Sequence, residues 1–188
     1  MVFQAEHQHL YDISPMVWFI HFREVGGPLR LARDVHAVSS ATSTPLPQEP
    51  PAHPTTALPA KRLVQILGGP ATVGENGVVT VDVPRAHGVV LGGIHVDPDL
   101  DIANNIQFEP LGNGKAAAVP DFALTAGEVN PVVRTMRGFG WEIGCLYNQE
   151  TAEHPPLYFS HMFKTGGPVA LARQIRAGLI RTDAVKPG

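Results

Sequence analysis

A stretch near the start of the chain is repeated without a gap near its end, and this duplication constrains the fold more than any other feature. When the sequence is shifted by 140 positions, residues 15–37 match residues 155–177 at ten of 23 positions. The identities include a Gly-Gly-Pro turn and a Leu-Ala-Arg triplet, which keep their order and spacing. Chance does not give such a match at one fixed shift, so the sequence predicts a duplicated supersecondary unit.

Both copies predict the same order of elements, namely strand, turn, strand and helix. The first strand of each copy alternates weakly, whereas the second is aromatic and β-branched, as in a buried strand. The Gly-Gly-Pro that follows breaks the strand and places proline in the first helical turn, where its missing N–H is tolerated. Apolar residues then recur at helical spacing. The predicted strands are residues 2–9, 16–23, 141–149 and 157–163, and the predicted helices follow Pro28 and Pro168.

Further elements precede the second copy only. AKRLVQILGG predicts a short helix, GVVTVDVPR a strand, IQFEPLG-NGK-AAAVPDFAL a hairpin and TAGEVNPVVRTMRGFG a helix. Thr125 and Glu128 have the spacing of a capping box at the start of that last helix. Capping is the favoured interpretation of Glu128, and the alternative is a general base that faces a site.

The first copy begins at Met1 and lacks these preceding elements. A strand without neighbours exposes an unpaired edge, so we expect a missing upstream segment or another chain to cover it. The sequence predicts an α+β fold of two related units with a mainly antiparallel sheet. The first unit, N-terminally truncated, is expected at residues 1–39, a Pro-rich linker at 40–59 and a complete second unit at 60–188.

The composition excludes several classes of function. Hydrophobic residues make up 44% of the 188 residues and charged residues 16%, so a packed core is expected. The net charge of −3 and the lack of a basic stripe argue against a nucleic-acid partner. Cys145 is the single cysteine, which excludes an internal disulfide and a cysteine-rich zinc site. Since no apolar run approaches the roughly 20 residues of a membrane span, the chain is expected to be soluble as it stands.

Three histidines near the amino terminus form the candidate site. His7 and His9 lie two residues apart on a predicted strand, so both side chains are expected on one face. His21, on the next strand, is the candidate third ligand, and three histidines with a water are a catalytic zinc pattern. Imidazole also binds copper, iron and nickel, so the expected cofactor is a divalent metal ion, with zinc the first candidate.

The strand pairing decides whether the three rings can converge. If residues 10–14 form a regular hairpin loop, His21 falls opposite Phe3, which is four residues from His7 and about 13 Å away along the strand. Convergence then requires a bulge or a shifted register. His21 also matches His161 of the second copy, which lacks the His-x-His pair, so a structural role for His21 remains the alternative.

The block that begins EVNPVVRTMRGFGWEIGCLYNQ and ends GGPVALARQIRAGL resembles the LppY/LpqO family, bacterial proteins described as a domain of unknown function. That family's pattern is a Glu-Val-Asn-Pro helix, a His-x-His strand, a strand ending in His, and a Gly/Pro turn before a helix. The resemblance covers residues 1–39 and about 60–182. It implies tandem α+β units, often behind a lipoprotein or secretory signal, and no established activity.

The resemblance also assigns site positions. The histidines of the family pattern fall on His7, His9 and His21 in the first copy. In the second copy only His161 remains, because Tyr147 and Gln149 replace the pair. The resemblance therefore implies a site in the first copy and leaves the second copy in doubt.

Two hypotheses for the function follow. The first is a metal-dependent enzyme, in which the histidine-bound ion acts on a small polar substrate. The second is a non-catalytic module that binds a small molecule or assembles as an oligomer, with a homodimer or a complementing chain over the N-terminal strand as the expected partner. The aromatic residues expected to line its pocket or interface are Trp18, Phe19, Tyr158 and Phe159.

Overall fold

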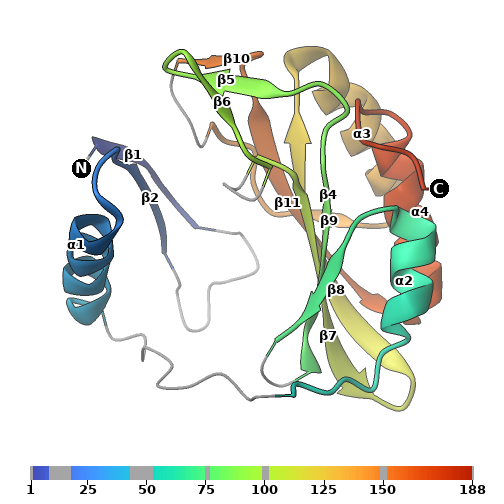
Figure 1. Ribbon diagram of the computed structural model, residues 1–188. Helices are drawn as coiled ribbons and strands as arrows, with labels where there is room; N and C mark the ends of the chain where they lie inside the picture. The colour runs from blue at the N-terminus through green and yellow to red at the C-terminus, as the bar shows by residue number, and fades with distance from the viewer. Residues whose placement is uncertain are drawn as a thin grey trace.

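The computed structural model describes residues 2–8, 18–42, 53–74, 77–98, 102–148 and 152–187, and within them the chain adopts an α+β architecture (Figure 1). This confirms the fold class predicted from the sequence. The helices are α1 (Pro28–Ser40), α2 (Ala60–Leu67), α3 (Ala126–Gly138) and α4 (Pro168–Leu179). The strands are β1 (Val2–His7), β2 (Phe19–Arg23), β3 (Ala71–Val73), β4 (Val79–Val83), β5 (Val89–Leu91), β6 (Ile94–Val96), β7 (Asn104–Gly112), β8 (Lys115–Leu124), β9 (Glu142–Ile143), β10 (Glu153–His154) and β11 (Tyr158–Gly166).

The main sheet of the described residues is antiparallel, with strand order β3-β4-β7-β8-β11-β9. Strands β7 and β8 form the predicted hairpin around Asn113 and Gly114, whose φ angles of 49° and 71° are both positive. Two central residues with positive φ match the twist of the flanking strands, and Asn-Gly is the dipeptide that adopts this turn most readily. A local signal therefore fixes the centre of the sheet.

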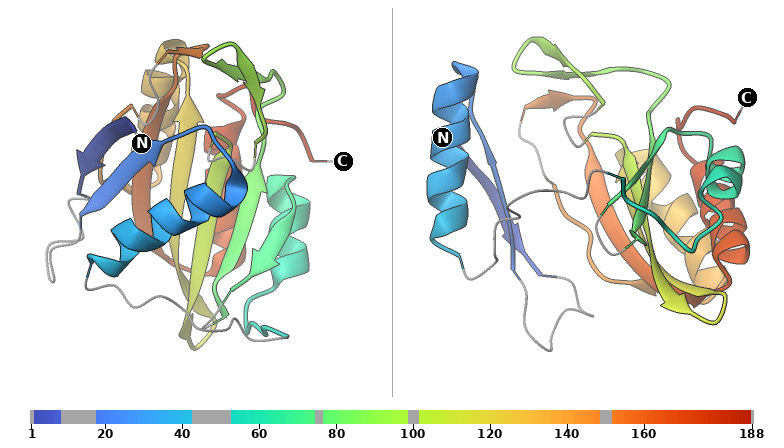
Figure 2. Two further views of the ribbon diagram at one scale, coloured as in Figure 1. Left: turned by 60° about the vertical axis from the view of Figure 1, so that its left-hand side comes forward. Right: turned by 60° about the horizontal axis from the view of Figure 1, so that its bottom comes forward.

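Helices α2, α3 and α4 cover one face of this sheet, and the hydrophobic core lies between them (Figure 2). Alternation along β4 buries Val79, Val81 and Val83 on that face and leaves Thr80 and Asp82 on the other. Helix α4 contributes an apolar stripe at helical spacing, which explains why its sequence forms an amphipathic helix. The stripe consists of Leu171, Ala172, Ile175 and Leu179, all buried.

The other face of the main sheet is covered in part by a small sheet with strand order β10-β5-β6. Its packing forms a second apolar cluster with β11, of Val89, Ile102, Ala123, Leu157 and Phe159. The hairpin β1-β2 lies on this same side, with α1 outside it (Figure 2). The hairpin and the helices α2–α4 therefore flank the main sheet on opposite faces. The site described below lies where the hairpin contacts this face.

The two copies of the repeated unit have the same strand pairing. In the first copy Phe3 pairs with Phe22 and His7 with Phe19, and the register shifts by one residue between them. In the second copy Ile143 pairs with Met162 and Tyr147 with Phe159, which is the same register and the same extra residue at a shift of 140. An extra residue in one strand is a β-bulge, which redirects the side chains near it. The repeat is therefore a repeat of backbone geometry as well as of sequence.

The two copies differ in what covers their helix. Helix α1 has no buried residue, and Val35 is 44% exposed, whereas the matching Ile175 of α4 has an exposed fraction of 0%. In the second copy α4 packs on α2, α3 and β8. Within the described residues nothing equivalent packs on α1.

Other predictions were coarser than the structure. Residues 141–149 were predicted as one strand, but β9 ends at Ile143, because the bulge interrupts regular pairing until Tyr147. Strands β5 and β6 were not predicted. The linker was predicted at residues 40–59, of which 43–52 lie outside the described residues, while Ser40 still belongs to α1. None of the helices in the described part of the chain has the length and apolar character to cross a bilayer.

Candidate functional site

A row of polar side chains crosses the face of the main sheet opposite the helices. Asp82 pairs with Asn105 between β4 and β7, Asn105 with Asp121 between β7 and β8, and Asp121 with His161 between β8 and β11. Paired residues in an antiparallel ladder project from the same face, so the register alone brings these side chains together. Cys145, on the segment that follows β9, lies next to His161 on the far side of β11.

His161 is the centre of this row because both its ring nitrogens have polar partners. The Nε2 atom lies 3.2 Å from the Oδ2 atom of Asp121, and the Nδ1 atom lies 3.3 Å from the Sγ atom of Cys145. The side chains of His161 and Asp121 are only 15% and 11% exposed. At such low exposure an electrostatic contact with the Asp121 carboxylate is screened less by water than it would be on the surface. Thiol, imidazole and carboxylate thus form a continuous chain.

Neighbouring groups hold this chain in place. The ring of Tyr147 stacks on that of His161 with a centroid distance of 5.6 Å and an interplanar angle of 3°, and its hydroxyl donates to Asp121 Oδ2 over 3.4 Å. Ser160 Oγ donates to the carbonyl oxygen of Cys145 over 2.9 Å, and the amide of Gly144 donates to the carbonyl of His161 over 2.9 Å. These contacts fix the plane of the His161 ring and the main chain at Cys145.

The hairpin of the first copy brings two more rings to this place. The centroid of His21 lies 5.5 Å from that of Tyr147, and the centroid of Phe19 lies 6.3 Å from that of His161. The matching histidines of the two copies, His21 and His161, therefore contact the same tyrosine from different elements. The sequence did not predict that the two copies face one another.

The predicted metal ligands are described only in part. His21 pairs with Ala5, two residues from His7, and not with Phe3 as a regular hairpin loop required. The correction arises from the bulge between Phe3 and Ala5, which the sequence analysis named as a condition for convergence. His9 and the side chain of His7 lie outside the described residues. Within the described part of the chain, no group of three or more His, Cys, Asp or Glu side chains is arranged to hold a metal ion.

The aromatic residues proposed to line a pocket or an interface have different environments. Phe159 is 1% exposed and belongs to the second apolar cluster, so it is a core residue and was wrongly predicted as a lining residue. Tyr158 is partly buried. Trp18 and Phe19 are 53% and 36% exposed, so of these four described residues the two in the first copy present aromatic surface.

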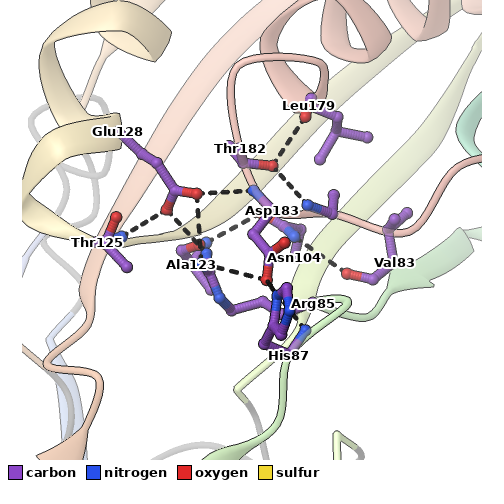
Figure 3. A network of polar contacts seen from close by, with 11 residues as sticks. Val83, Arg85, His87, Asn104, Ala123, Thr125, Glu128, Leu179, Thr182 and Asp183 are labelled. Carbon is purple, nitrogen blue, oxygen red and sulfur yellow. Dashed lines mark hydrogen bonds and ion pairs between the residues drawn. The ribbon is translucent and has the colours of Figure 1, made fainter.

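A separate polar network surrounds the start of α3 (Figure 3). Glu128 and Thr125 form the predicted capping box, so capping is confirmed as the role of Glu128. The Glu128 carboxylate also accepts from Arg85 over 2.9 Å and from the amide of Asp183 over 2.7 Å. Arg85 is nearly buried and donates to the carbonyl of Ala123 over 2.8 Å as well. These contacts fix α3, β8 and the C-terminal segment to one another.

The charges of this network shift two pKa values. Burial raises the pKa of Glu128, but the hydrogen bonds from Arg85 and from the Thr125 amide outweigh it, so the pKa is lowered. Burial likewise raises the pKa of Asp183, but the hydrogen bonds from His87 outweigh it and this pKa is lowered too. His87, predicted as a solvated residue, is exposed and contacts Asp183 through Nδ1 at 2.9 Å. Since both carboxylate oxygens of Glu128 accept hydrogen bonds from the fold, the network is structural.

The chain formed by Cys145, His161 and Asp121 was not predicted from the sequence. Cys145 was read only as evidence against disulfides, and His161 as a structural residue. A single cysteine in a chain that also has histidine and aspartate is the one available signal of a thiol site, but it does not say which residues meet. Their meeting depends on the order of β8, β11 and β9, which no local pattern encodes.

Comparison with known proteins gives one family. A family model described as Domain of Unknown Function (DUF1259) matches residues 61–181, which is well over half of the chain. No curated protein and no solved structure matches the chain. The matched region includes Asp121, Cys145 and His161, whereas the predicted ligands of the first copy lie outside it. The resemblance to LppY/LpqO proteins stays a prediction.

Proposed function

Because this chain belongs to the family described as Domain of Unknown Function (DUF1259), membership brings no activity with it, and we propose a function from the site itself. The chain binds a divalent metal ion, zinc being the first candidate, through His7, His9 and His21. The bound ion would polarise a small polar substrate or activate a water that attacks it. The protein would then be a metal-dependent enzyme.

The strand register is the observation that supports this proposal. With His21 opposite Phe3, the predicted distance to His7 along the strand was about 13 Å, too far for one ion to bridge. With His21 opposite Ala5, the two positions are diagonal neighbours, which are typically about 7–8 Å apart in a ladder. Two imidazoles at that spacing can reach one ion with Zn–N distances of about 2 Å.

The surroundings of His21 support it as well. The ring of His21 lies against Tyr147, which hydrogen-bonds to Asp121. An aromatic ring packed against an imidazole restricts the orientations available to it and favours a fixed ligand.

Metal content tests the proposal directly. The untagged wild-type protein, a His7→Ala/His9→Ala variant and a His95→Ala control are dialysed against equimolar zinc, copper and nickel, and their metal is measured by elemental analysis. His95 is an exposed histidine of β6, so its loss changes the histidine count without touching the site. We expect about one ion per chain in the wild type and the control, and none in the double variant.

The alternative results are equally clear. Metal at background in the wild type would remove the proposal. Metal retained in the double variant but lost in His21→Ala would move the site to other ligands. Circular dichroism of each variant shows whether a loss of metal follows from a loss of fold.

A second candidate, a homodimer, is favoured by the surface of α1. This helix has no buried residue, Leu29 is 76% exposed, and Val35 presents apolar surface at the position where α4 buries Ile175. We propose that two chains pair through α1. Sedimentation velocity should show a dimer for the wild type and a Lys61→Glu control on α2, and a monomer for Val35→Glu. A monomeric wild type at micromolar concentration contradicts it.

A further inference from the structure

We infer that Cys145 is a nucleophilic thiol, which accepts an acyl group from a small ester or thioester. His161 is its general base, and Asp121 positions His161. These three residues are separate from the metal ligands proposed above, and the inference does not depend on a bound ion. It adds to the chain a second chemistry, which resides in the second copy of the repeated unit.

A nucleophile, a base and an orienting group must contact one another in that order, and these three residues do. Cys145 Sγ lies 3.3 Å from His161 Nδ1, and His161 Nε2 lies 3.2 Å from Asp121 Oδ2. His161 and Asp121 come from the adjacent strands β11 and β8. Cys145 lies in the short segment between β9 and Tyr147, and both ends of this segment pair with β11. Backbone pairing therefore sets the relative placement of the three groups, and groups fixed by strand pairing are held more precisely than groups on free loops.

The position of the ring proton of His161 decides which of its nitrogens can act as the base. A carboxylate can only accept hydrogen bonds, so the tautomer of neutral His161 that suits the contact with Asp121 carries its ring proton on Nε2. The Nδ1 atom is then the unprotonated nitrogen, and it is the one that faces the thiol. This tautomer can take the thiol proton directly and leave a thiolate next to an imidazolium, the arrangement that makes cysteine a strong nucleophile. Stacking on Tyr147 keeps the ring in this orientation.

The first copy of the repeated unit has no thiol at the position that matches Cys145. The position of Cys145 is taken by Ala5 in the first copy, where the strand pairing and the bulge are the same. Alanine therefore builds this hairpin as well as cysteine does, and the sulfur is not required by the fold. Cys145 is also partly exposed, so a small reagent can reach it.

The reaction balances without any further reactant. The thiol proton passes to His161 Nδ1 while Sγ forms a bond to the acyl carbon of the ester. The bond between that carbon and the leaving oxygen breaks, and the leaving oxygen takes the proton from Nδ1. A water, deprotonated by His161, then attacks the thioester, the C–S bond breaks, the acid leaves and Sγ regains a hydrogen. No atom changes its oxidation state.

The test uses p-nitrophenyl acetate as the acyl donor. The full chain, treated with chelator and then dialysed, is mixed with the ester at pH 7, and transfer of one acetyl group to the peptide that contains Cys145 is followed by mass spectrometry. The same chain unfolded in urea is the reference thiol, and because Cys145 is the single cysteine no other thiol reacts. A positioned general base is worth roughly 100-fold or more, so the folded chain should react on the order of 100 times faster than the unfolded one.

Variants separate the roles of the three residues. His161→Gln should lower the rate to about that of the unfolded chain, with circular dichroism as the check on folding. Asp121→Asn should lower it less and change the pH dependence of acylation, a readout that a purely structural role would not move. The matched control is Ala5→Cys in a Cys145→Ser background, which places a thiol opposite His21, where β1 is the only described strand that pairs with β2. That thiol should react like the unfolded reference.

Two results would overturn the inference. One is a folded wild type that is acylated no faster than its unfolded form, which needs no variant to interpret. The other is an Ala5→Cys thiol that reacts as fast as Cys145, since the contact between His161 and Asp121 would then not be needed for the reaction. Both readouts are taken without metal, so failure here leaves the metal proposal intact, and a failed metal measurement leaves acylation unaffected.

Discussion

Ile175 and Val35 occupy the same position in the two copies of one helix but have opposite environments, so they isolate what packing contributes to stability. Ile175 is fully buried in the main core, and Val35 is 44% exposed on α1. Truncating a buried isoleucine to alanine loses the transfer free energy of its carbons and leaves a cavity, at a cost of about 2–5 kcal/mol. In a single chain Val35→Ala loses little burial and gains helix propensity. At protein concentrations low enough to dissociate the proposed dimer, its free energy of unfolding should therefore change by no more than about 0.5 kcal/mol.

Urea unfolding measures this difference. The indole of Trp141 is 4% exposed and donates to Gln174 on α4 over 3.0 Å, so its fluorescence reports on the helix that carries Ile175. A Trp18→Phe background removes the other tryptophan. With an m-value of about 1–3 kcal/mol/M, a loss of 3 kcal/mol lowers the midpoint for Ile175→Ala by about 1–3 M. Ile175→Val should cost only about 0.5–1.5 kcal/mol.

The reasoning fails if the two truncations cost the same. A large cost for Val35→Ala would mean that the α1 surface is covered in solution, and a dependence of that cost on protein concentration would identify a second chain as the cover. A negligible cost for Ile175→Ala would mean that α4 does not pack on the sheet as described.

Three further predictions concern the polar network around Glu128 and the close approach of Gly69 to the backbone of β4. The pKa values of Glu128 and Asp183 are lowered on folding, so these groups stabilise the fold fully above their unfolded pKa values of about 4.5 and 3.8 and lose that stabilisation as the pH falls through their folded pKa values. The urea midpoint should therefore decrease as the pH is lowered below about 5, and it should decrease less steeply in Glu128→Gln. Arg85→Met leaves the Glu128 carboxylate without its guanidinium and should cost about 3 kcal/mol, measured by the same unfolding, unless Glu128→Gln accompanies it. A Cβ on Gly69 would overlap the carbonyl oxygen of Asp82. Gly69→Ala should therefore lower the free energy of unfolding by about 1–3 kcal/mol, which thermal unfolding would show as a lower midpoint temperature.

Local signals in the sequence predicted most of the second unit. Asn113-Gly114 predicted the β7–β8 turn, Thr125 and Glu128 predicted the start of α3, and the repeat predicted that α1 and α4 would form in the same way. Strands β5 and β6 were missed because three-residue strands are too short for alternation to be visible. The bulge was not predicted either, because a one-residue change of register leaves no trace in composition and is decided by pairing.

The candidate site was harder to predict, and the reason is the number of strands that it requires. His7, His9 and His21 belong to one hairpin, so a spacing argument along two neighbouring strands could propose them. The chain from Cys145 through His161 to Asp121 crosses three strands, β9 and its extension, β11 and β8, that are paired out of chain order. In the second copy, β11 has a neighbour on each side, whereas in the first copy the described part of the chain pairs β2 with β1 alone. A histidine flanked by strands on both sides can be given a carboxylate on one side and a thiol on the other. The same histidine at the edge of a two-stranded hairpin can receive only one such partner from its own sheet. The neighbours that the sheet supplies therefore allow one duplicated unit to carry imidazole ligands in one copy and a thiol–imidazole–carboxylate chain in the other.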